Sequence, residues 1–365
     1  MSDAEDRRQE LASQLRRLQK KAEDLRGEVT FSEVIEEATD AEASLPAVGA
    51  ELERLRARGY AFRGDLEDAL GEVRDQLGDA VAELRDRAER ASDRMRGEAR
   101  TLSRQAAKLT PRKARRIEAL DAELRGFKRE VREVRERLEA LTAPLRAKLA
   151  MVSGKTKDLH WTLDQFDGAS FKLQPAERPV AVTQATWEDA PGGAQPAGLL
   201  MFTDHRVYFE QKEEKVTKRT FIFFAAETES LHKLMIDEPL GHLEDASDAT
   251  RGWVMKDQLL AFSWAREAKA PEKTTFKLAS GTASDWDGVV ELLRAGDLKA
   301  YEADAASTAT SDVVGGAPPT AARHEVRWPE NCAACAAPLT APVKGQTAIA
   351  CGYCGTNHAV EFVET

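Results

Sequence analysis

All four cysteines of the chain lie in two CxxC pairs near its C-terminal end. Cys332 pairs with Cys335 and Cys351 with Cys354, and fifteen residues separate the two pairs. Each CxxC turn brings two sulfurs to one side of the chain, so two such turns supply the four thiolates of a tetrahedral zinc site. Because four thiolates leave no coordination position open, we expect one structural zinc per chain, with iron as an alternative metal in the same cage.

Redox chemistry and disulfides suit these cysteines less well. A redox CxxC normally occurs once, at a helix N-terminus beside a strand. The N-terminal residues contain no apolar segment typical of a secretory signal, and no apolar run reaches the roughly 18 residues that a membrane span needs. We therefore expect a soluble cytoplasmic protein without disulfides.

The cysteine segment, residues 329–365, is too short to bury a stable core unaided, so a metal would have to cross-link it. Alternating residues predict short strands at Gln346–Ala350 and Ala359–Val363. With its second pair in the form CGYCGT, Cys351–Thr356, the segment resembles a rubredoxin-type zinc ribbon of a compact form found in many bacterial proteins. His358 is expected to lie at the surface or beside the ligands rather than to bind the metal.

Residues 1–165 are predicted to be helical, because apolar residues recur there at steps of three and four. The clearest stripe runs from Ile117 to Leu149 and is as narrow as a coiled-coil seam. Thr110 and Pro111 combine a capping hydroxyl with a proline, so we expect long helices at about 46–109 and 111–151. Chain breaks are expected at Gly27–Ser32 and before Pro46, and the glycines at Gly59–Gly64 weaken the first long helix.

The helical region divides into an acidic and a basic part. Residues 1–100 carry 18 basic and 25 acidic side chains, whereas residues 101–160 carry 16 basic and 8 acidic ones. This polarity favours an antiparallel coiled-coil hairpin, although pairing between chains would use the same stripe and give a homo-oligomer. The cations Arg112, Lys113, Arg115 and Arg116 are expected to face carboxylates or solvent. The alternative is that they bind nucleic acid or anionic lipid.

From about residue 171 short β-branched and aromatic runs predict a β-rich domain that ends in an amphipathic helix capped by Ser284. The predicted elements are strands at Pro179–Trp187, Thr220–Ala226, Leu259–Trp264 and Thr274–Ala279, a two-strand hairpin at Gly198–Gln211 and a short helix at Glu229–Ile236. The hairpin GLLMFTDHRVYFEQ turns at Thr203–Arg206 and, with the final helix bearing Trp286, resembles a pleckstrin-homology or GRAM-like domain over about residues 171–296.

This resemblance implies a binding platform rather than a catalyst. Many such domains hold phosphoinositide head groups with cations of the first hairpin loop, but the loop Glu188–Gly198 has none and carries two carboxylates. A protein partner is therefore the better interpretation. Lys212, Lys215, Lys218 and Arg219 follow in the next loop, with Glu213 and Glu214 among them.

The sequence as a whole predicts a multidomain protein: a coiled-coil hairpin, a PH-like domain, a flexible linker at 297–328 and a zinc ribbon. No constellation of nucleophile and base is present, so we expect a non-enzymatic scaffold or adaptor with protein partners. The alternatives are a membrane-associated stress or remodelling protein, and a nucleic-acid-associated regulator using the ribbon and the basic helix. A membrane partner is less favoured than a protein partner. A nucleic-acid partner is disfavoured for two reasons: no aromatic residues that could stack on bases accompany the cations, and Lys344 is the only Lys or Arg after Cys332.

Overall fold

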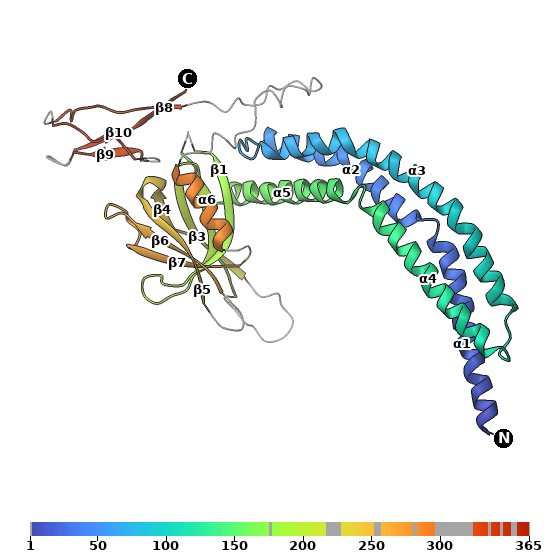
Figure 1. The fold of residues 1–365 in the computed structure, drawn as a ribbon. Helices are drawn as coiled ribbons and strands as arrows, with labels where there is room; N and C mark the ends of the chain where they lie inside the picture. The colour runs from blue at the N-terminus through green and yellow to red at the C-terminus, as the bar shows by residue number, and fades with distance from the viewer. Residues whose placement is uncertain are drawn as a thin grey trace. The chain divides into compact units, whose positions relative to one another are not determined.

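In the computed structural model, a helical region precedes a seven-stranded antiparallel sheet, and short strands follow (Figure 1). The structure describes residues 2–174, 177–216, 228–251, 257–279, 283–295, 324–334, 337–343, 346–351 and 356–364. The chain divides into two compact units. We call residues 1–50 and 68–154 the helical unit, and residues 51–67 with 155–365 the sheet unit.

The helical unit is a bundle of helices that run side by side. It contains α1 (Ser2–Glu28), most of α2 (Ser32–Ala57) and α3 (Asp65–Lys108), all of α4 (Ala114–Glu139) and the first part of α5 (Ala143–Asp167). Hydrogen bonds from Gln19 to the Ala106 carbonyl and from Arg85 to Thr39 show that α3 runs antiparallel to α1 and α2. Ion pairs place α4 and α5 alongside α1 and α2 in the same direction.

The narrow stripe predicted from the sequence forms the core of this bundle. The α4 side chains that are buried are Ile117, Leu120, Leu124, Phe127, Val131, Val134 and Leu138. In this structure they are covered by helices of the same chain. Ion pairs join acidic and basic helices, but Arg135–Glu33 at 2.7 Å and Arg146–Glu37 at 2.6 Å link α4 and α5 to α2, which runs parallel to them rather than antiparallel as the predicted hairpin requires. The pair between Lys148 and Glu72 joins the antiparallel helices α5 and α3.

The helix start predicted at residue 46 is wrong, because α2 runs through Pro46. The weak point expected at Gly59–Gly64 is confirmed as a break, since α2 ends at Ala57 and α3 begins at Asp65. Pro46 lies on the exposed face of α2, where water can satisfy the carbonyl that the proline leaves without a donor. The break predicted between Gly27 and Ser32 is confirmed.

The helix predicted at 111–151 starts later and is interrupted. It begins at Ala114, so Pro111 is in the preceding turn, and α4 ends at Glu139 before α5 starts at Ala143. Pro144 supplies the physical reason, because a proline is tolerated in the first turn of a helix and disfavoured inside one.

Arg56 holds the turn between α2 and α3 within the sheet unit. Its guanidinium donates to the carbonyls of Tyr60, Phe62 and Arg63 at 2.8, 2.5 and 3.0 Å and forms an ion pair with Glu67. The backbone here adopts left-handed φ values of 89° at Gly59 and 63° at Arg63. One buried side chain therefore bonds three carbonyls of the turn. The Arg63 carbonyl also accepts the Leu66 N–H at 3.1 Å, so the Tyr60 and Phe62 carbonyls depend most on Arg56.

The sheet has the strand order β4-β3-β2-β1-β7-β6-β5. Its strands are β1 (Pro179–Trp187), β2 (Ala197–Thr203), β3 (Arg206–Val216), β4 (Thr228–Pro239), β5 (Leu243–Arg251), β6 (Asp257–Trp264) and β7 (Lys273–Leu278). Helix α6 (Ala283–Ala295) packs on β5 and β6. The aromatic core includes Phe202, Phe209, Phe262 and Phe276, and the ring of Trp286 stacks on Phe202.

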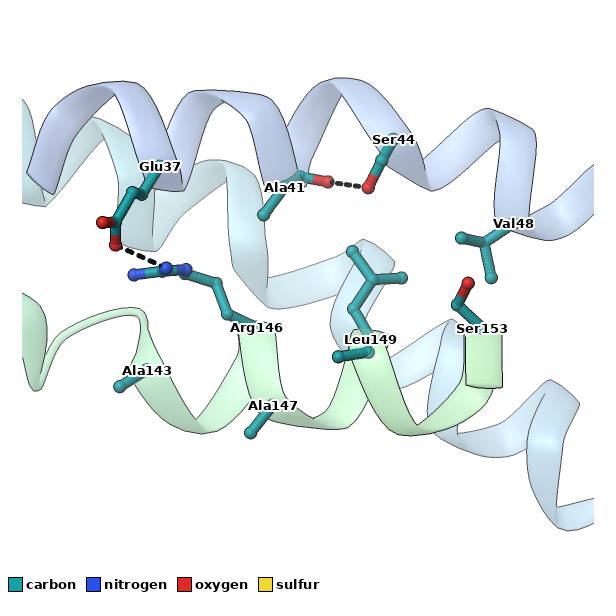
Figure 2. A pocket seen from close by; sticks show the side chains of 10 residues that line it. Glu37, Ala41, Ser44, Val48, Ala143, Arg146, Ala147, Leu149 and Ser153 are labelled. Atoms are coloured by element: carbon teal, nitrogen blue, oxygen red, sulfur yellow. Dashed lines mark hydrogen bonds and ion pairs between the residues drawn. The ribbon is translucent and has the colours of Figure 1, made fainter. Parts of the chain in front are cut away.

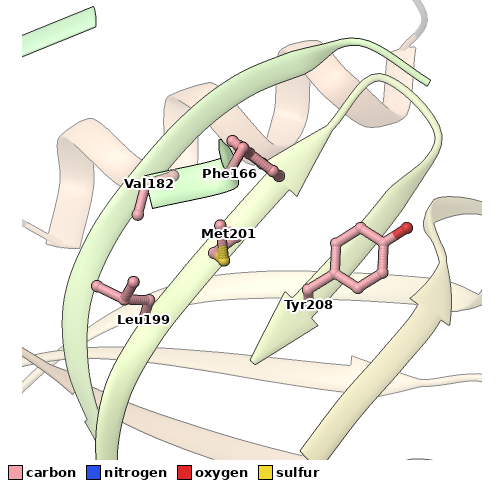
Figure 3. Packing of buried hydrophobic residues seen from close by; sticks show 5 residues of the cluster. All are labelled: Phe166, Val182, Leu199, Met201 and Tyr208. Atoms are coloured by element: carbon pink, nitrogen blue, oxygen red, sulfur yellow. The ribbon is translucent and has the colours of Figure 1, made fainter. Parts of the chain in front are cut away.

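The end of α5 packs on this sheet. Figure 3 shows Phe166 of α5 beside Val182 of β1, with Leu199 and Met201 of β2 and Tyr208 of β3. The hairpin requires glycine at position 198, because a Cβ there would collide with the Glu210 carbonyl of β3. The predicted turn is confirmed: the Thr203 hydroxyl accepts the backbone N–H groups of His205 and Arg206.

Two neighbouring strands, β4 and β5, differ from what local sequence propensity predicts. Glu229–Ile236, predicted as a short helix, belongs to strand β4, which pairs with β3 along its full length. Strand β5 was missed because LEDASDATR has few strand-forming residues. Ser284 lies inside α6 rather than capping it, and the strand predicted at Thr220–Ala226 lies outside the described residues.

Short strands also occur near the C-terminal end. β8 (His324–Arg327) pairs with β11 (Glu361–Glu364), and β9 (Ala348–Ala350) pairs with β10 (Asn357–Ala359). The linker predicted at 297–328 therefore overlaps a strand at its end, because pairing with β11 orders residues that have no local strand pattern of their own.

Arg56→Met tests the anchor of the α2–α3 turn. The variant keeps an apolar stem but removes the Arg56 donor from the Tyr60 and Phe62 carbonyls and from Glu67, so we expect the free energy of unfolding in urea to fall by about 3 kcal/mol. Arg54→Met is the matched control, since Arg54 pairs with Glu51 on an exposed face, and it should cost less than about 1 kcal/mol. Equal losses in the two variants would contradict the anchoring role.

Candidate functional site

The candidate metal site has two described cysteines. Cys332 and Cys351 are each buried, with 2% of the side chain exposed, whereas Cys335 and Cys354 lie outside the described residues. For that reason the described part of the chain contains no group of three or more metal-ligating side chains. The two cysteines that are described nevertheless show how each CxxC pair is built.

The two CxxC segments are closed by the same backbone hydrogen bond. The Cys332 N–H donates to the Ala337 carbonyl at 2.8 Å, and the Cys351 N–H donates to the Thr356 carbonyl at 2.9 Å. In both segments the bond joins the first cysteine to the residue five positions later. The first cysteine of each pair is therefore buried and held by an equivalent backbone hydrogen bond, which is compatible with a thiolate ligand at each of these two positions.

His358 lies beside Cys332, which is one of the two placements that the sequence left open for it. It is on β10, its side chain is 9% exposed, and its Nε2 atom lies 3.2 Å from the Cys332 sulfur. A ring N–H at that distance can donate to a thiolate, and such donors stabilise the charged form of a metal ligand. The interaction could not be read from the sequence, since 26 positions separate the two residues.

The sheet unit contains a second cluster of polar side chains, built around Glu177. The Tyr208 hydroxyl donates to both Glu177 carboxylate oxygens at 2.9 and 2.8 Å, and Arg206 bonds Asp237 at 2.5 Å. Burial raises the pKa of Glu177, and the hydrogen bonds from the Gln174 N–H and from Tyr208 offset that effect only in part. Burial, followed by the charge of Glu177, raises the pKa of Tyr208.

Asp204 joins the hairpin turn to the segment before β1. It accepts the Arg178 N–H at 2.9 Å, the Arg178 Nε at 2.8 Å and the His205 ring at 2.7 Å. Burial by itself acts to raise the pKa of Asp204, but these bonds and charges outweigh it, and the pKa is lowered. The Arg178 guanidinium also lies 4.7 Å from the centre of the Phe62 ring.

Other carboxylates of the sheet unit serve as internal acceptors in the same way. Glu238 accepts the N–H groups of Lys269 and Ala270, and Glu210 accepts that of Ser170. Asp189, in the loop after β1, accepts the Trp187 ring N–H and the Thr275 backbone N–H, both at 2.8 Å. This loop is therefore tied down by its own carboxylate, and it presents no cation to a phosphate.

A cavity of about 570 Å³ lies between α2 and α5 in the helical unit. Figure 2 shows Ala41 and Ser44 of α2 facing Ala147 and Leu149 of α5 across it. Its charged lining residues are Glu37 and Arg146, which are bonded to each other. The lining therefore offers small side chains and one neutralised pair rather than a nucleophile with a base.

No family model matches the chain, and no curated protein matches it. Among solved structures, the DH/PH domains of p115-RhoGEF are similar at 13% identity and a TM-score of 0.21, over 72% of this chain and 98% of that chain. Autoinhibited Vav1 is similar at 11% identity and a TM-score of 0.24, over 95% of this chain and 69% of that one. At these scores the likenesses establish neither a family nor a function. Within the described residues, no helix is long and apolar enough to cross a membrane.

Asp204→Asn tests the charged link before β1. Because the pKa of Asp204 is lower in the folded protein than in the unfolded chain, where it is about 3.9, its carboxylate stabilises the fold. This stabilisation is fully present above the pKa of the unfolded chain and is lost as the pH falls through the pKa of the folded protein. We expect the variant to lose about 3 kcal/mol at pH 7 and the difference from the wild type to shrink below about pH 4. Urea denaturation followed by tryptophan fluorescence measures both, with the exposed Asp248→Asn as control. A difference that did not change with pH would contradict this assignment.

Proposed function

We propose that the protein is a non-enzymatic adaptor whose sheet unit binds a protein partner. The observation that carries this is that the buried carboxylates of the sheet unit bond backbone N–H groups, tyrosine or arginine of the same unit. Such groups stabilise the fold, and most of their oxygens are engaged; among the buried carboxylates of the described residues, only the Glu210 Oε2 atom has no hydrogen-bond partner. The unit therefore has a surface to offer rather than a reactive cavity. The strand order and the final helix support a PH-like domain of the GRAM type.

A protein suits this domain better than a lipid head group. The loop between β1 and β2 carries Glu188 and Asp189 and no Lys or Arg, so it would repel a phosphate. Strand β5 is an edge of the sheet, and its described side chains include the exposed carboxylates Glu244, Asp245 and Asp248. An extended basic peptide can pair with such an edge and be held by its charge.

The C-terminal segment would stabilise a second contact surface through zinc. Cys332, Cys335, Cys351 and Cys354 would hold one ion, and His358 would donate to the Cys332 thiolate. When bound, Zn²⁺ neutralises the thiolates and cross-links a segment that is too short to fold by itself. The equivalent backbone turns at the two pairs support this assignment.

Charge reversal at β5 tests the adaptor proposal. With the intact protein as bait, partners captured by the wild type should be lost with Asp245→Lys/Asp248→Lys, because the edge would then repel a basic peptide. The matched control is Glu267→Lys/Glu272→Lys, two exposed carboxylates of the same sheet unit that lie away from β5. Binding to phosphoinositide vesicles without any protein partner would refute the proposal.

Metal analysis tests the zinc site. The purified protein should contain one zinc per chain, and Cys351→Ser should release it and make residues 324–364 sensitive to protease, since the remaining thiolates cannot close the tetrahedron. The urea unfolding of the seven-stranded sheet should be unchanged, which separates loss of metal from general misfolding. A zinc-free protein whose C-terminal segment resists protease would refute the site.

A further inference from the structure

Two stretches of the helical unit contain cations and no carboxylates. Residues 99–117 include seven Lys and Arg side chains, and residues 11–22 include four, with no Asp or Glu in either stretch. We call these eleven side chains the basic end: Arg16, Arg17, Lys20, Lys21, Arg100, Arg104, Lys108, Arg112, Lys113, Arg115 and Arg116. All eleven are exposed.

The fold brings the two stretches together. The Gln19 side chain donates to the Ala106 carbonyl at 3.0 Å, and the Ser103 hydroxyl lies 3.4 Å from the Glu23 carboxylate, which places α1 against the end of α3. Lys21 and Asp121 are 3.5 Å apart, which places α1 against α4 as well. Cations that are about 90 positions apart in the sequence therefore surround one end of the bundle (Figure 1).

Three cations farther along α4 and α5 are neutralised by neighbouring helices, unlike most of the basic end. Arg135, Arg146 and Lys148 are bonded to carboxylates of α2 or α3. In the basic end, Lys21 pairs with Asp121, and the other ten cations form no ion pair with any described residue. Like charges one turn apart, as at Arg100, Arg104 and Lys108, destabilise a helix slightly, so a bound polyanion would relieve repulsion that the fold leaves in place.

The position of α1 along α3 indicates whether a membrane or a nucleic acid could reach the basic end. Because Gln19 lies beside Ala106, and a helix rises 1.5 Å per residue, the first nine residues of α1 extend past the α3–α4 turn by roughly 15 Å (Figure 1). This extension exposes three carboxylates, Glu5, Asp6 and Glu10, and two cations, Arg7 and Arg8. A flat anionic membrane approaching the end of the bundle would meet this segment, in which carboxylates outnumber cations by one, before it met the basic end. A rod-shaped polyanion can lie across the side of the bundle.

We propose that the basic end binds the phosphodiester backbone of duplex nucleic acid without reading its sequence. Seven of the eleven cations are arginine, whose planar guanidinium can donate two hydrogen bonds to one phosphate. Residues 11–22 span about 18 Å of helix, which corresponds to about ten phosphates of a duplex at one charge per 1.7 Å. The exposed cations on one side of the bundle could contact about five of these phosphates. No exposed aromatic residue lies among these cations to stack on bases.

Fluorescence anisotropy with the intact protein and a labelled duplex of 20 base pairs tests the proposal. Affinity should fall with salt between 50 and 200 mM KCl, with a slope of log K against log salt of about −4.5, as five phosphate contacts predict. Arg115→Glu/Arg116→Glu should weaken binding at least tenfold and reduce that slope. Both substitutions lie at the start of α4, where a carboxylate suits the helix dipole, so the fold should persist.

The matched control is Lys128→Glu/Arg129→Glu, which makes the same charge change at two exposed cations of α4 outside the basic end. It should weaken binding less than twofold. A second variant, Arg100→Glu/Arg104→Glu on α3, should reproduce the loss, and circular dichroism should show unchanged helix in all three variants. Equal losses in the test and control variants would overturn the proposal, since they would indicate attraction to net charge alone.

Two further outcomes would also overturn it. The first is the absence of duplex binding at 50 mM KCl. The second is binding to phosphatidylglycerol vesicles without binding to the duplex, which would make the basic end a membrane contact instead. The adaptor proposal is tested at β5 of the other unit, so the two proposals can fail separately.

Discussion

The helical unit depends on covering apolar stripes that are each only one side chain wide. A helix of the length of α4 has little stability alone in water, so its stripe must pack against partners. The chain provides those partners itself, in α1, α2 and α3. Once the stripes are matched, the register of every flanking charge is fixed, and the ion pairs from Arg135 to Glu33 and from Arg146 to Glu37 follow from that register.

The same register leaves the charges at the far end of the bundle unmatched. There the cations of α1 meet those of α3 and α4, and the carboxylates that neutralise such side chains elsewhere are missing from both stretches. The packing of apolar residues thus decides where the bundle is electrostatically satisfied and where it is not. A surface of that kind is costly to the isolated fold and useful to a partner of opposite charge.

In the sheet unit, by contrast, the buried charges have bonding partners within the unit. Glu177, Asp204 and Glu238 are buried, and each is bonded to a hydroxyl, a guanidinium or backbone N–H groups. A buried carboxylate without such partners would be strongly destabilising, so these bonds hold turns and strand ends in place.

The sequence by itself determined the features that are encoded by neighbouring residues. Step-three and step-four periodicity located the helical stripes, alternation located β1, β2, β6 and β7, and the CxxC spacing identified the candidate metal ligands. It did not determine the path of the chain through Pro46, the break before Pro144 or strand β4, whose local propensity is helical. Only the tertiary structure placed His358 beside Cys332 and Gln19 beside Ala106, because such pairings depend on how distant elements pack, and periodicity along one element carries no information about its partner.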